Sequence, residues 1–446
     1  MPRDLIFHFY RCGTGLNHFL RRRVRPAGIA VLIVIVVAAG LAVGNADTPV
    51  YLSFALACGL VIVGLSGLPC RRAKLSAVRE LPGHATVGQA LSYGVEIINH
   101  QRRQLRRFQL LEIAPDPRPD QMQFRSVREP GEATRNFFDR GLAWYRWNWL
   151  CESRRNFDDG RSPAVDRLQR AEGGTVTMTL TPLRRGLVRL NDLRVLLPDP
   201  LGLFQRCVKV AAASATLVVL PRRYALPCFE LPGGARCESG GESVARESGG
   251  GGEFTGLRDY QSGDPLRLVH WPTWARTGRP VVKELEDEVF PRHGLVLDQF
   301  PRAGDEDLFE HAVSVAASFL AGVDARESSI ELLFPAAEKR TLSAGRGPGR
   351  AEMLLEVLAS VECAPGDDFE EVAQRVIRHA DGLAGCLCVF AGWSDSRADL
   401  LRRLKRAGIE VAAIVVCREL SVAVPGCHFV RATELAADLQ KLPREW

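Results

Sequence analysis

The sequence predicts a membrane α-helical hairpin, then a β-sandwich, then an α/β domain with a mostly parallel sheet. Two uncharged apolar segments lie near the start, short alternating segments fill residues 76–222, and apolar runs alternate with helical patterns from Gly294 onward. The 446 residues are enough for about two or three domains with hydrophobic cores. The formal net charge of +6 is small for this length, so charge alone does not imply a nucleic-acid partner.

The two apolar segments are residues 27–44 and 50–68, and neither contains a charged residue. Each approaches the roughly 20 residues that a membrane-spanning helix needs. Because only residues 45–49 separate them, they are expected to form a two-helix transmembrane hairpin within residues 27–70. One such segment alone would also fit a buried core helix or a signal peptide, but a tandem pair favours the hairpin.

Basic residues flank the hairpin on both sides, whereas the loop between the helices carries only Asp47. The flanking residues are Arg21, Arg22, Arg23, Arg25, Arg71, Arg72 and Lys74. The positive-inside rule therefore places both ends of the hairpin in the cytoplasm. Residues 1–26 are then a basic cytoplasmic N-terminus, and the soluble domains are cytoplasmic as well.

Residues 71–237 are expected to form the β-sandwich-like domain. Its clearest alternation puts Val176, Met178 and Leu180 on one face of a strand. Short strands separated by Gly and Pro are typical of an antiparallel sandwich.

An insertion at residues 124–174 interrupts this β pattern. It is rich in arginine and contains Trp144, Trp147 and Trp149. Arginines and aromatics together suit packing on the parent domain, contact with anionic lipid headgroups, or single-stranded nucleic-acid binding. Nucleic acid is the least favoured of the three, and we expect no such partner.

The rest of the chain divides into a Gly-rich linker at 238–252, a charged signature segment at 253–290 and the α/β domain at 291–446. In the last part, expected strands are 294–298, 329–334, 386–390 and 409–416, and expected helices are 306–320, 351–361, 369–379 and 397–406. Strands that alternate with helices indicate a parallel sheet wrapped by helices.

The signature segment combines charged groups, aromatics and turn glycines. Its candidate binding residues are Arg258, Asp259, Tyr260, Asp264, Arg267, His270, Trp271 and Arg276. A structural motif would pair arginines with aspartates and bury Tyr260 and Trp271 beside a turn at Gly263–Pro265. A docking surface would instead expose the arginines and the tryptophan. A catalytic site would use Asp264 and His270.

The arrangement resembles a bacterial membrane-protein family known as domain of unknown function fifty-eight. The residues that carry the resemblance are Arg184-Arg185-Gly186, the run Asp199-Pro200-Leu201-Gly202-Leu203-Phe204, and the 253–286 stretch. Members of that family accompany MoxR-type AAA+ ATPases, and the resemblance implies a von Willebrand factor A-like C-terminal region. The chain departs from the family pattern in its long insertion and in Trp274, where a small residue is usual.

The resemblance also raises the question of a metal site. Von Willebrand A domains often hold Mg²⁺ through Asp-x-Ser-x-Ser after the first strand, but here Phe300 and Arg302 replace the two serines that would follow Asp298. Mg²⁺ requires oxygen ligands, and Asp395 cannot restore the set. The 12 cysteines contain no Cys-x-x-Cys pair that would indicate zinc. We therefore expect no metal site and no cofactor.

These patterns together predict a non-enzymatic adaptor anchored in the bacterial inner membrane. A MoxR-type ATPase would supply the energy for assembling membrane or envelope complexes, since no nucleotide-binding loop is visible in the sequence. One alternative is a membrane-face enzyme with Asp264 and His270 as base and Asp298 as an additional acid. The other is an anionic-lipid-binding scaffold that uses the tryptophans of the insertion.

Overall fold

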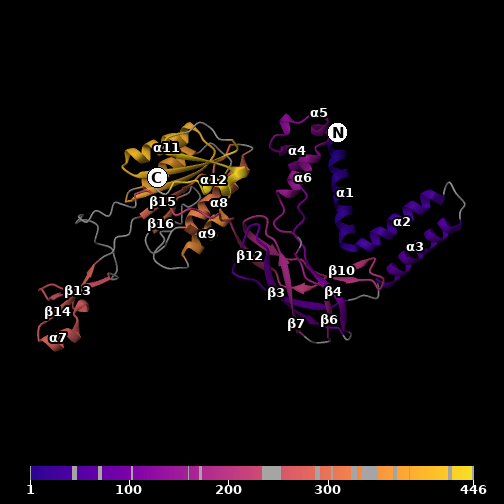
Figure 1. Ribbon diagram of the computed structural model, residues 1–446, viewed down its shortest axis with the longest axis horizontal. Helices are drawn as coiled ribbons and strands as arrows, with labels where there is room; N and C mark the ends of the chain where they lie inside the picture. The colour runs from indigo at the N-terminus through magenta and orange to yellow at the C-terminus, as the bar shows by residue number, and fades with distance from the viewer. Residues whose placement is uncertain are drawn as a thin grey trace. The chain divides into compact units, whose positions relative to one another are not determined.

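The computed structural model divides the chain into two compact units (Figure 1). It describes residues 2–42, 48–68, 73–101, 104–158, 160–169, 173–233, 253–286, 292–302, 305–322, 329–333, 350–364, 369–380, 382–419 and 424–443. The first unit is Met1–Arg223 with Leu355–Glu362, and the second is Tyr224–Leu354 with Cys363–Trp446. The Gly-rich linker 238–252, most of the hairpin turn at 45–49, and Arg71 and Arg72 lie outside the described residues.

The first unit begins with a helix that the sequence analysis did not predict, α1 (Pro2–Arg23). Asp4 lies in its first turn and Arg21–Arg23 lie in its last turn. A negative charge at the N-terminal end and positive charges at the C-terminal end interact favourably with the helix dipole and stabilise α1. Pro26 then opens α2 (Pro26–Ala42), and the residue before a proline avoids the helical conformation. Arg25 therefore separates α1 from α2.

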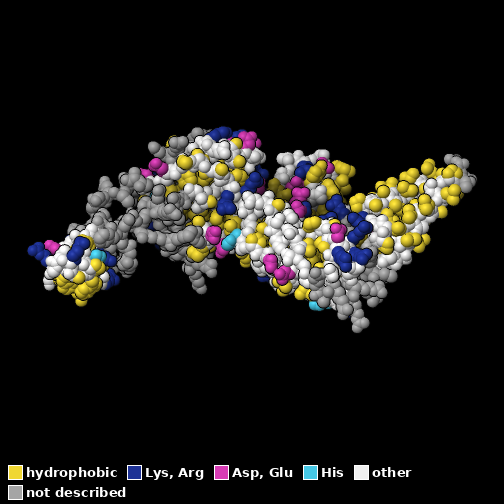
Figure 2. All heavy atoms as spheres, turned by 60° about the horizontal axis from the view of Figure 1, so that its bottom comes forward, with side chains coloured by type: hydrophobic (Ala, Val, Ile, Leu, Met, Phe, Trp, Pro, Cys, Tyr) yellow, Lys and Arg dark blue, Asp and Glu magenta, His cyan; other side chains and the backbone are white. Residues whose placement is uncertain are grey.

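Two apolar helices follow, α2 and α3 (Thr48–Gly67), and they run side by side (Figure 1). Large side chains are exposed along both of them, including Val36 at 71% and Leu56 at 68%, and Figure 2 shows the hydrophobic surface that results. Among the described residues, Pro49–Gly67 is long and apolar enough to cross a membrane, whereas α2 is shorter. The structure thus provides one apolar span candidate.

The β part of the first unit is confirmed as a sandwich-like domain of two sheets. One sheet has the order β10-β9-β4-β5-β7-β3-β1-β11 with β6 beside β4, and the other has the order β2-β12-β8. The strands are β1 (Leu75–Glu80), β2 (His84–Thr86), β3 (Leu91–Asn99), β4 (Leu105–Glu112), β5 (Gly160–Arg161), β6 (Val165–Leu168), β7 (Gly173–Leu180), β8 (Gly186–Leu190), β9 (Leu193–Pro198), β10 (Gln205–Lys209), β11 (Ala211–Ala212) and β12 (Ala215–Leu220). Val176, Met178 and Leu180 share the core face of β7, as their alternation predicted.

The insertion packs on its own unit, against α1. It begins within α4 (Gln121–Ser126) and continues with η1 (Glu132–Thr134), α5 (Phe137–Leu142) and α6 (Trp144–Glu152), followed by β5 and β6. Phe7 and Tyr10 of α1 form a small core with Phe124 and Trp147. The prediction of lipid contact is therefore wrong for Trp147, because this ring is fully buried between α1 and the insertion. Trp144 is 44% exposed.

The second unit contains a five-stranded parallel sheet in the order β16-β15-β17-β18-β19, which confirms the predicted sheet type. Its strands are β15 (Arg292–Leu297), β16 (Ser329–Leu333), β17 (Gly385–Ala391), β18 (Glu410–Cys417) and β19 (Cys427–Arg431). Its helices are α8 (Glu306–Gly322), α10 (Phe369–His379), α11 (Asp395–Arg406) and α12 (Leu435–Leu439), with η3 (Ala432–Glu434) before the last. A further helix, α9 (Arg350–Ser360), has residues 350–354 in the second unit and its remaining residues in the first. Every residue of β17 is buried, as expected for a central parallel strand.

Candidate functional site

The signature segment folds as a hairpin with a helical cap. β13 (Glu253–Asp259) pairs antiparallel with β14 (Val281–Glu286), and the connection carries η2 (Leu266–Leu268) and α7 (Trp271–Thr277). The cap is tied to the strands, since Tyr260 N donates to Pro280 O at 3.0 Å and His270 N donates to Val281 O at 2.9 Å. Val282 is buried beneath the cap.

Arg258 and Asp264 form the bidentate pair that the structural interpretation predicted. Arg258 Nη1 lies 2.7 Å from Asp264 Oδ2, and Nη2 lies 2.7 Å from Oδ1. The backbone N–H of Gln261 also donates to Oδ2, at 2.9 Å. These donors, with Arg258 first, lower the pKa of Asp264 to about 2. Asp264 therefore holds the connection between β13 and η2 in place.

His270 has a different neighbour. Its Nδ1 lies 2.7 Å from Thr273 Oγ1, inside the first turn of α7. Asp264 and His270, the proposed catalytic pair, thus bond to different residues. In this arrangement each side chain stabilises a separate part of the connection.

The structural interpretation is wrong about Trp271, which it expected to be buried, because the ring lies on the surface of α7 and is 60% exposed. It stacks on Trp274 with ring centroids 5.2 Å apart and planes 17° apart, since residues three apart share one face of a helix. Leu257 and Leu266 are also exposed, at 40% and 68%. Figure 2 shows hydrophobic side chains gathered on one side of this hairpin.

Charged side chains accompany this apolar surface. Asp259, Arg267 and Arg276 are exposed, whereas Tyr260 is half-buried beside the connection. We define the signature surface as Leu257, Leu266, Arg267, Trp271 and Arg276. It combines large apolar groups with arginines, the residue types that are enriched at binding hot spots.

Asp298 lies at the second place where the sequence indicated chemistry. It follows β15 directly, where the strand order reverses between β16 and β17. Open α/β sheets bind ligands at this switch point. Asp298 is fully buried, with Oδ1 accepting from Phe300 N at 2.9 Å and Oδ2 accepting from Ala391 N at 3.2 Å.

A guanidinium group fills the remaining position beside Asp298. Arg397 of α11 donates to Asp298 Oδ2 through Nε at 2.7 Å, and its Nη1 and Nη2 reach Ser394 and the Phe300 carbonyl. The Phe369 ring lies 5.0 Å from the guanidinium carbon. Burial raises the pKa of Asp298, and the charge of Arg397 acts against that rise.

The two other residues considered for a metal site lie elsewhere. Asp395 is exposed in the first turn of α11, and Arg302 donates to the Trp393 carbonyl at 3.2 Å. The cation beside Asp298 is therefore Arg397, which sequence reasoning missed. Within the described residues, no group of three or more His, Cys, Asp or Glu side chains is placed to hold a metal ion.

The turn Asp199–Phe204 forms the joint between the β domain and the apolar helices. Arg25 N donates to Leu203 O at 2.9 Å, and a Cβ on Gly28 of α2 would lie 2.2 Å from the same oxygen. On the other side, a Cβ on Gly64 of α3 would lie 2.8 Å from Asp199 Oδ2. Only glycine lets both helices approach this turn so closely.

Comparison with known proteins identifies the domain. Residues 256–438 match the family described as protein of unknown function DUF58. This chain carries a DUF58 domain. The DUF58 domain contains most of the signature hairpin and almost all of the parallel sheet, so both the Arg258–Asp264 pair and the Asp298–Arg397 pair lie inside it. The joint and the apolar helices precede it.

A relative of this chain is YeaD of Bacillus subtilis, itself described as uncharacterized, which is 27% identical over 220 residues. The match covers 46% of this chain and 52% of YeaD, so the chain spans about half the length of this curated relative. YeaD is a distant homologue.

Two solved structures resemble part of the chain. They are a CARDB domain from Pyrococcus furiosus in complex with di-metal ions (10% identity, TM-score 0.17, 33% of this chain and 89% of that chain) and a PapD-like domain of human CEP192 (14% identity, TM-score 0.15, 33% and 82%). Scores this low support no argument about function.

Replacing Asp264 by Asn should loosen the connection between β13 and α7. We expect amide hydrogen exchange there to accelerate roughly two- to fivefold, as for a partly exposed ion pair. Arg258→Gln should have the same effect, and the double variant should add little because both changes remove one interaction. Asp259→Asn, at the exposed neighbouring carboxylate, is the control and should leave exchange unchanged.

The same ion pair gives a pH dependence. Because the pKa of Asp264 falls from 3.8 to about 2 on folding, the pair stabilises the connection fully above pH 3.8. That stabilisation is lost as the pH falls from 3.8 to about 2. Exchange in the Asp264→Asn variant should therefore lack this component of the acid response.

Replacing Arg397 by Met should destabilise the α/β sheet by about 3–5 kcal/mol, because a buried carboxylate is left without its counter-charge. Hydrogen exchange of β15 and β17 in the full-length protein would measure the loss. Arg402→Met on the exposed side of the same helix is the control, since its ion pair with Asp399 is long, at 3.5 Å. Equal effects of the two changes would contradict the structural role of Arg397.

Replacing Gly28 by Val should separate α2 from the joint, because the new side chain would overlap the Leu203 carbonyl. We expect a cost of about 1–3 kcal/mol or more and a melting temperature lower by several degrees in detergent. Gly40→Val, in the same helix with nothing within 4 Å of a Cβ, is the matched control. A similar fall in both variants would attribute the effect to α2 rather than to the joint.

Proposed function

We propose that this protein is a non-enzymatic, membrane-anchored cytoplasmic adaptor that works with a MoxR-type AAA+ ATPase. Its task would be the assembly or maturation of membrane or envelope complexes at the bacterial inner membrane. The single observation that carries the proposal is the signature surface, whose exposed apolar side chains lie on a hairpin with an internal ion pair. Large exposed apolar groups rimmed by charge are typical of protein–protein contact sites.

The anchor in this proposal is the pair α2–α3. α3 has the length and composition of a spanning helix. α2 is apolar over its 17 residues, which corresponds to about 26 Å of helix against a hydrocarbon core of roughly 30 Å. Arg21–Arg23 before α2 and Lys74 after α3 would keep both ends on the cytoplasmic side.

The α/β sheet would serve as a von Willebrand factor A-like platform. In such a platform Arg397 would take the place that a divalent cation has in metal-binding members of that fold class. Binding would then depend on side chains rather than on a bridging ion. This favours the signature surface as the docking region.

Two contacts weigh against the enzyme alternative. Asp264 accepts hydrogen bonds from Arg258 and Gln261, and these lower its pKa and its strength as a base. Asp298, the additional acid in that alternative, is fully buried against Arg397. All of these groups already have structural partners.

The proposal is tested by affinity capture of the tagged full-length protein in mild detergent, with and without ATP, followed by mass spectrometry. A MoxR-type ATPase should be captured, and Trp271→Ala should reduce its capture at least about tenfold, because hot-spot aromatics contribute this much or more to binding. Leu187→Ser, at an exposed leucine of β8 outside the signature surface, is the matched control. Absence of the ATPase from every sample would contradict the proposal, as would equal capture by Trp271→Ala.

A further inference from the structure

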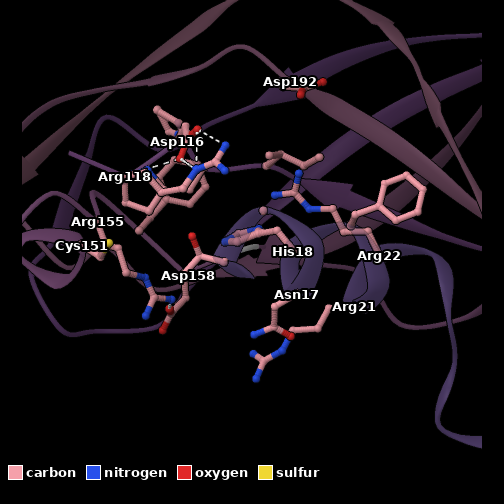
Figure 3. Close-up of a pocket in the computed structure, with 18 of the residues that line it drawn as sticks. Asn17, His18, Arg21, Arg22, Asp116, Arg118, Cys151, Arg155, Asp158 and Asp192 are labelled. Carbon is pink, nitrogen blue, oxygen red and sulfur yellow. Dashed lines mark hydrogen bonds and ion pairs between the residues drawn. The ribbon is translucent and has the colours of Figure 1, made fainter. Parts of the chain in front are cut away.

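A large groove lies in the first unit beside the end of α1 (Figure 3). Its volume is close to 1190 Å³, and it is formed by α1, the segment after β4, α6 with the loop that follows it, and the strands around Asp192. Trp147 and Phe157, both fully buried, contribute to its floor. Part of the groove is therefore lined by aromatic rings of the hydrophobic cores.

The groove carries an excess of positive charge. Eight arginines and four carboxylates line it, which gives a formal charge of +4 with His18 counted as neutral. Figure 3 shows His18, Arg21 and Arg22 coming from α1, with Asp116 and Arg118 from the segment after β4. A concave surface lined by charges of one sign concentrates the electrostatic field and attracts ions of the opposite charge.

Three of the four carboxylates are held by arginines of the groove itself. Asp192 pairs with Arg194 at 2.7 Å, Asp116 accepts from Arg118 Nε at 2.8 Å, and Asp158 pairs with Arg155. The Arg118 and Arg194 contacts lower the pKa of their carboxyl groups, so both pairs stay ionised and neutral overall at pH 7. The excess charge therefore belongs to the other arginines.

Arg161 of β5 and Arg189 of β8 are two of these arginines. Both side chains are exposed and line the groove, and within the described part of the chain neither has a carboxylate partner. Arginine presents a planar fork of donors that suits the oxygens of a phosphate group. Both residues line the same groove, where each can donate hydrogen bonds to an anion that enters it.

The position of the groove suggests where the anion comes from. Arg21–Arg23 line the groove and form the last turn of α1, three residues before α2 begins at Pro26. Gln205 Nε2 donates to Arg22 O at 3.1 Å and fixes this turn to β10. Figure 2 shows Lys and Arg side chains gathered where the apolar helices join the β domain. With α2 in the membrane, the groove would open at the level of the headgroups.

We propose that this groove binds a phosphate-ester anion, supplied by the headgroup of an anionic phospholipid. The inference rests on the proposed membrane anchoring only for the source of the phosphate. A soluble phosphate ester shares the recognising chemistry, and the experiment separates the two sources. The site differs from the tryptophan contact considered above, because its binding groups are arginines and Trp147 serves as its floor.

The test uses full-length protein purified in detergent and reconstituted into nanodiscs of phosphatidylcholine, alone or mixed with phosphatidylglycerol. After release into detergent, native mass spectrometry counts the lipids that remain bound. The test variant is Arg161→Gln with Arg189→Gln, which leaves the arginines that flank α2 intact. Arg106→Gln, at an exposed arginine of β4 outside the groove, is the matched control.

The parent and Arg106→Gln should retain phosphatidylglycerol, and the double variant should retain at least tenfold less. A second arm adds glycerol phosphate to the detergent-solubilised protein and follows the melting temperature. A rise in the parent that the double variant lacks, without retained phosphatidylglycerol, would assign the groove to a soluble phosphate ester. Equal lipid retention by parent and double variant, or no response in either arm, would overturn the proposal.

Failure of the anchoring is measured separately. Alkaline carbonate extraction of membranes would release the full-length protein if α2 and α3 did not span the bilayer, whatever the groove binds. The double variant should also capture the ATPase as the parent does, since the groove and the signature surface share no residue. Loss of lipid retention with normal extraction behaviour would therefore concern the groove alone.

Discussion

Asp298 places a carboxylate at the buried end of a parallel sheet, and Arg397 supplies the positive charge that makes this burial tolerable. The two groups meet where the strand order reverses, which is the position that ligands occupy in open α/β sheets. The guanidinium also bonds to Ser394 and to the Phe300 carbonyl, so one side chain connects β15 and α11. The same principle recurs on the signature hairpin, where Arg258 neutralises Asp264 and shapes the connection.

The joint at Asp199–Phe204 has an equivalent role in the first unit, but it depends on shape rather than charge. Glycines of α2 and α3 allow the turn to enter between the ends of the two helices. Because α1 ends at the same place, the joint also fixes the basic turn that lines the groove. A motif that served as a family marker in the sequence is therefore the part that connects the apolar helices to the β domain.

Periodicity was sufficient to predict most of the α/β sheet. The helix predicted at 369–379 has those bounds, and β17 and β18 lie within a residue of their expected ends, because buried parallel strands read as continuous apolar runs. β19 was not predicted, because it is a half-buried edge strand and lacks a continuous apolar run. α1 was not predicted, because its apolar residues pack against the insertion, which lies more than 100 residues away in the sequence.

The candidate site was harder to predict, for physical reasons. An arginine–aspartate pair could be anticipated in the signature segment because Arg258 and Asp264 are only six residues apart in the sequence. Arg397 lies 99 residues after Asp298, so only the fold brings the two together. The available signal was an arginine in the first turn of the helix after β17, two residues after Asp395, which was considered as a metal ligand. The structural interpretation placed Trp271 in a buried position beside the turn at Gly263–Pro265, but on the seven-residue helix α7 its ring stacks on Trp274 at the surface.

A counter-ion that belongs to the polypeptide cannot be exchanged. A bound divalent cation is shared with the solution, so its occupancy follows the concentrations of free ion and chelator, and a surface that depends on it can be turned on and off. Arg397 is present at a fixed ratio to Asp298, because it is part of the same chain. The sheet of this DUF58 domain thus has its charge balance set at synthesis, and the Asp298–Arg397 pair does not depend on the concentration of a free divalent cation.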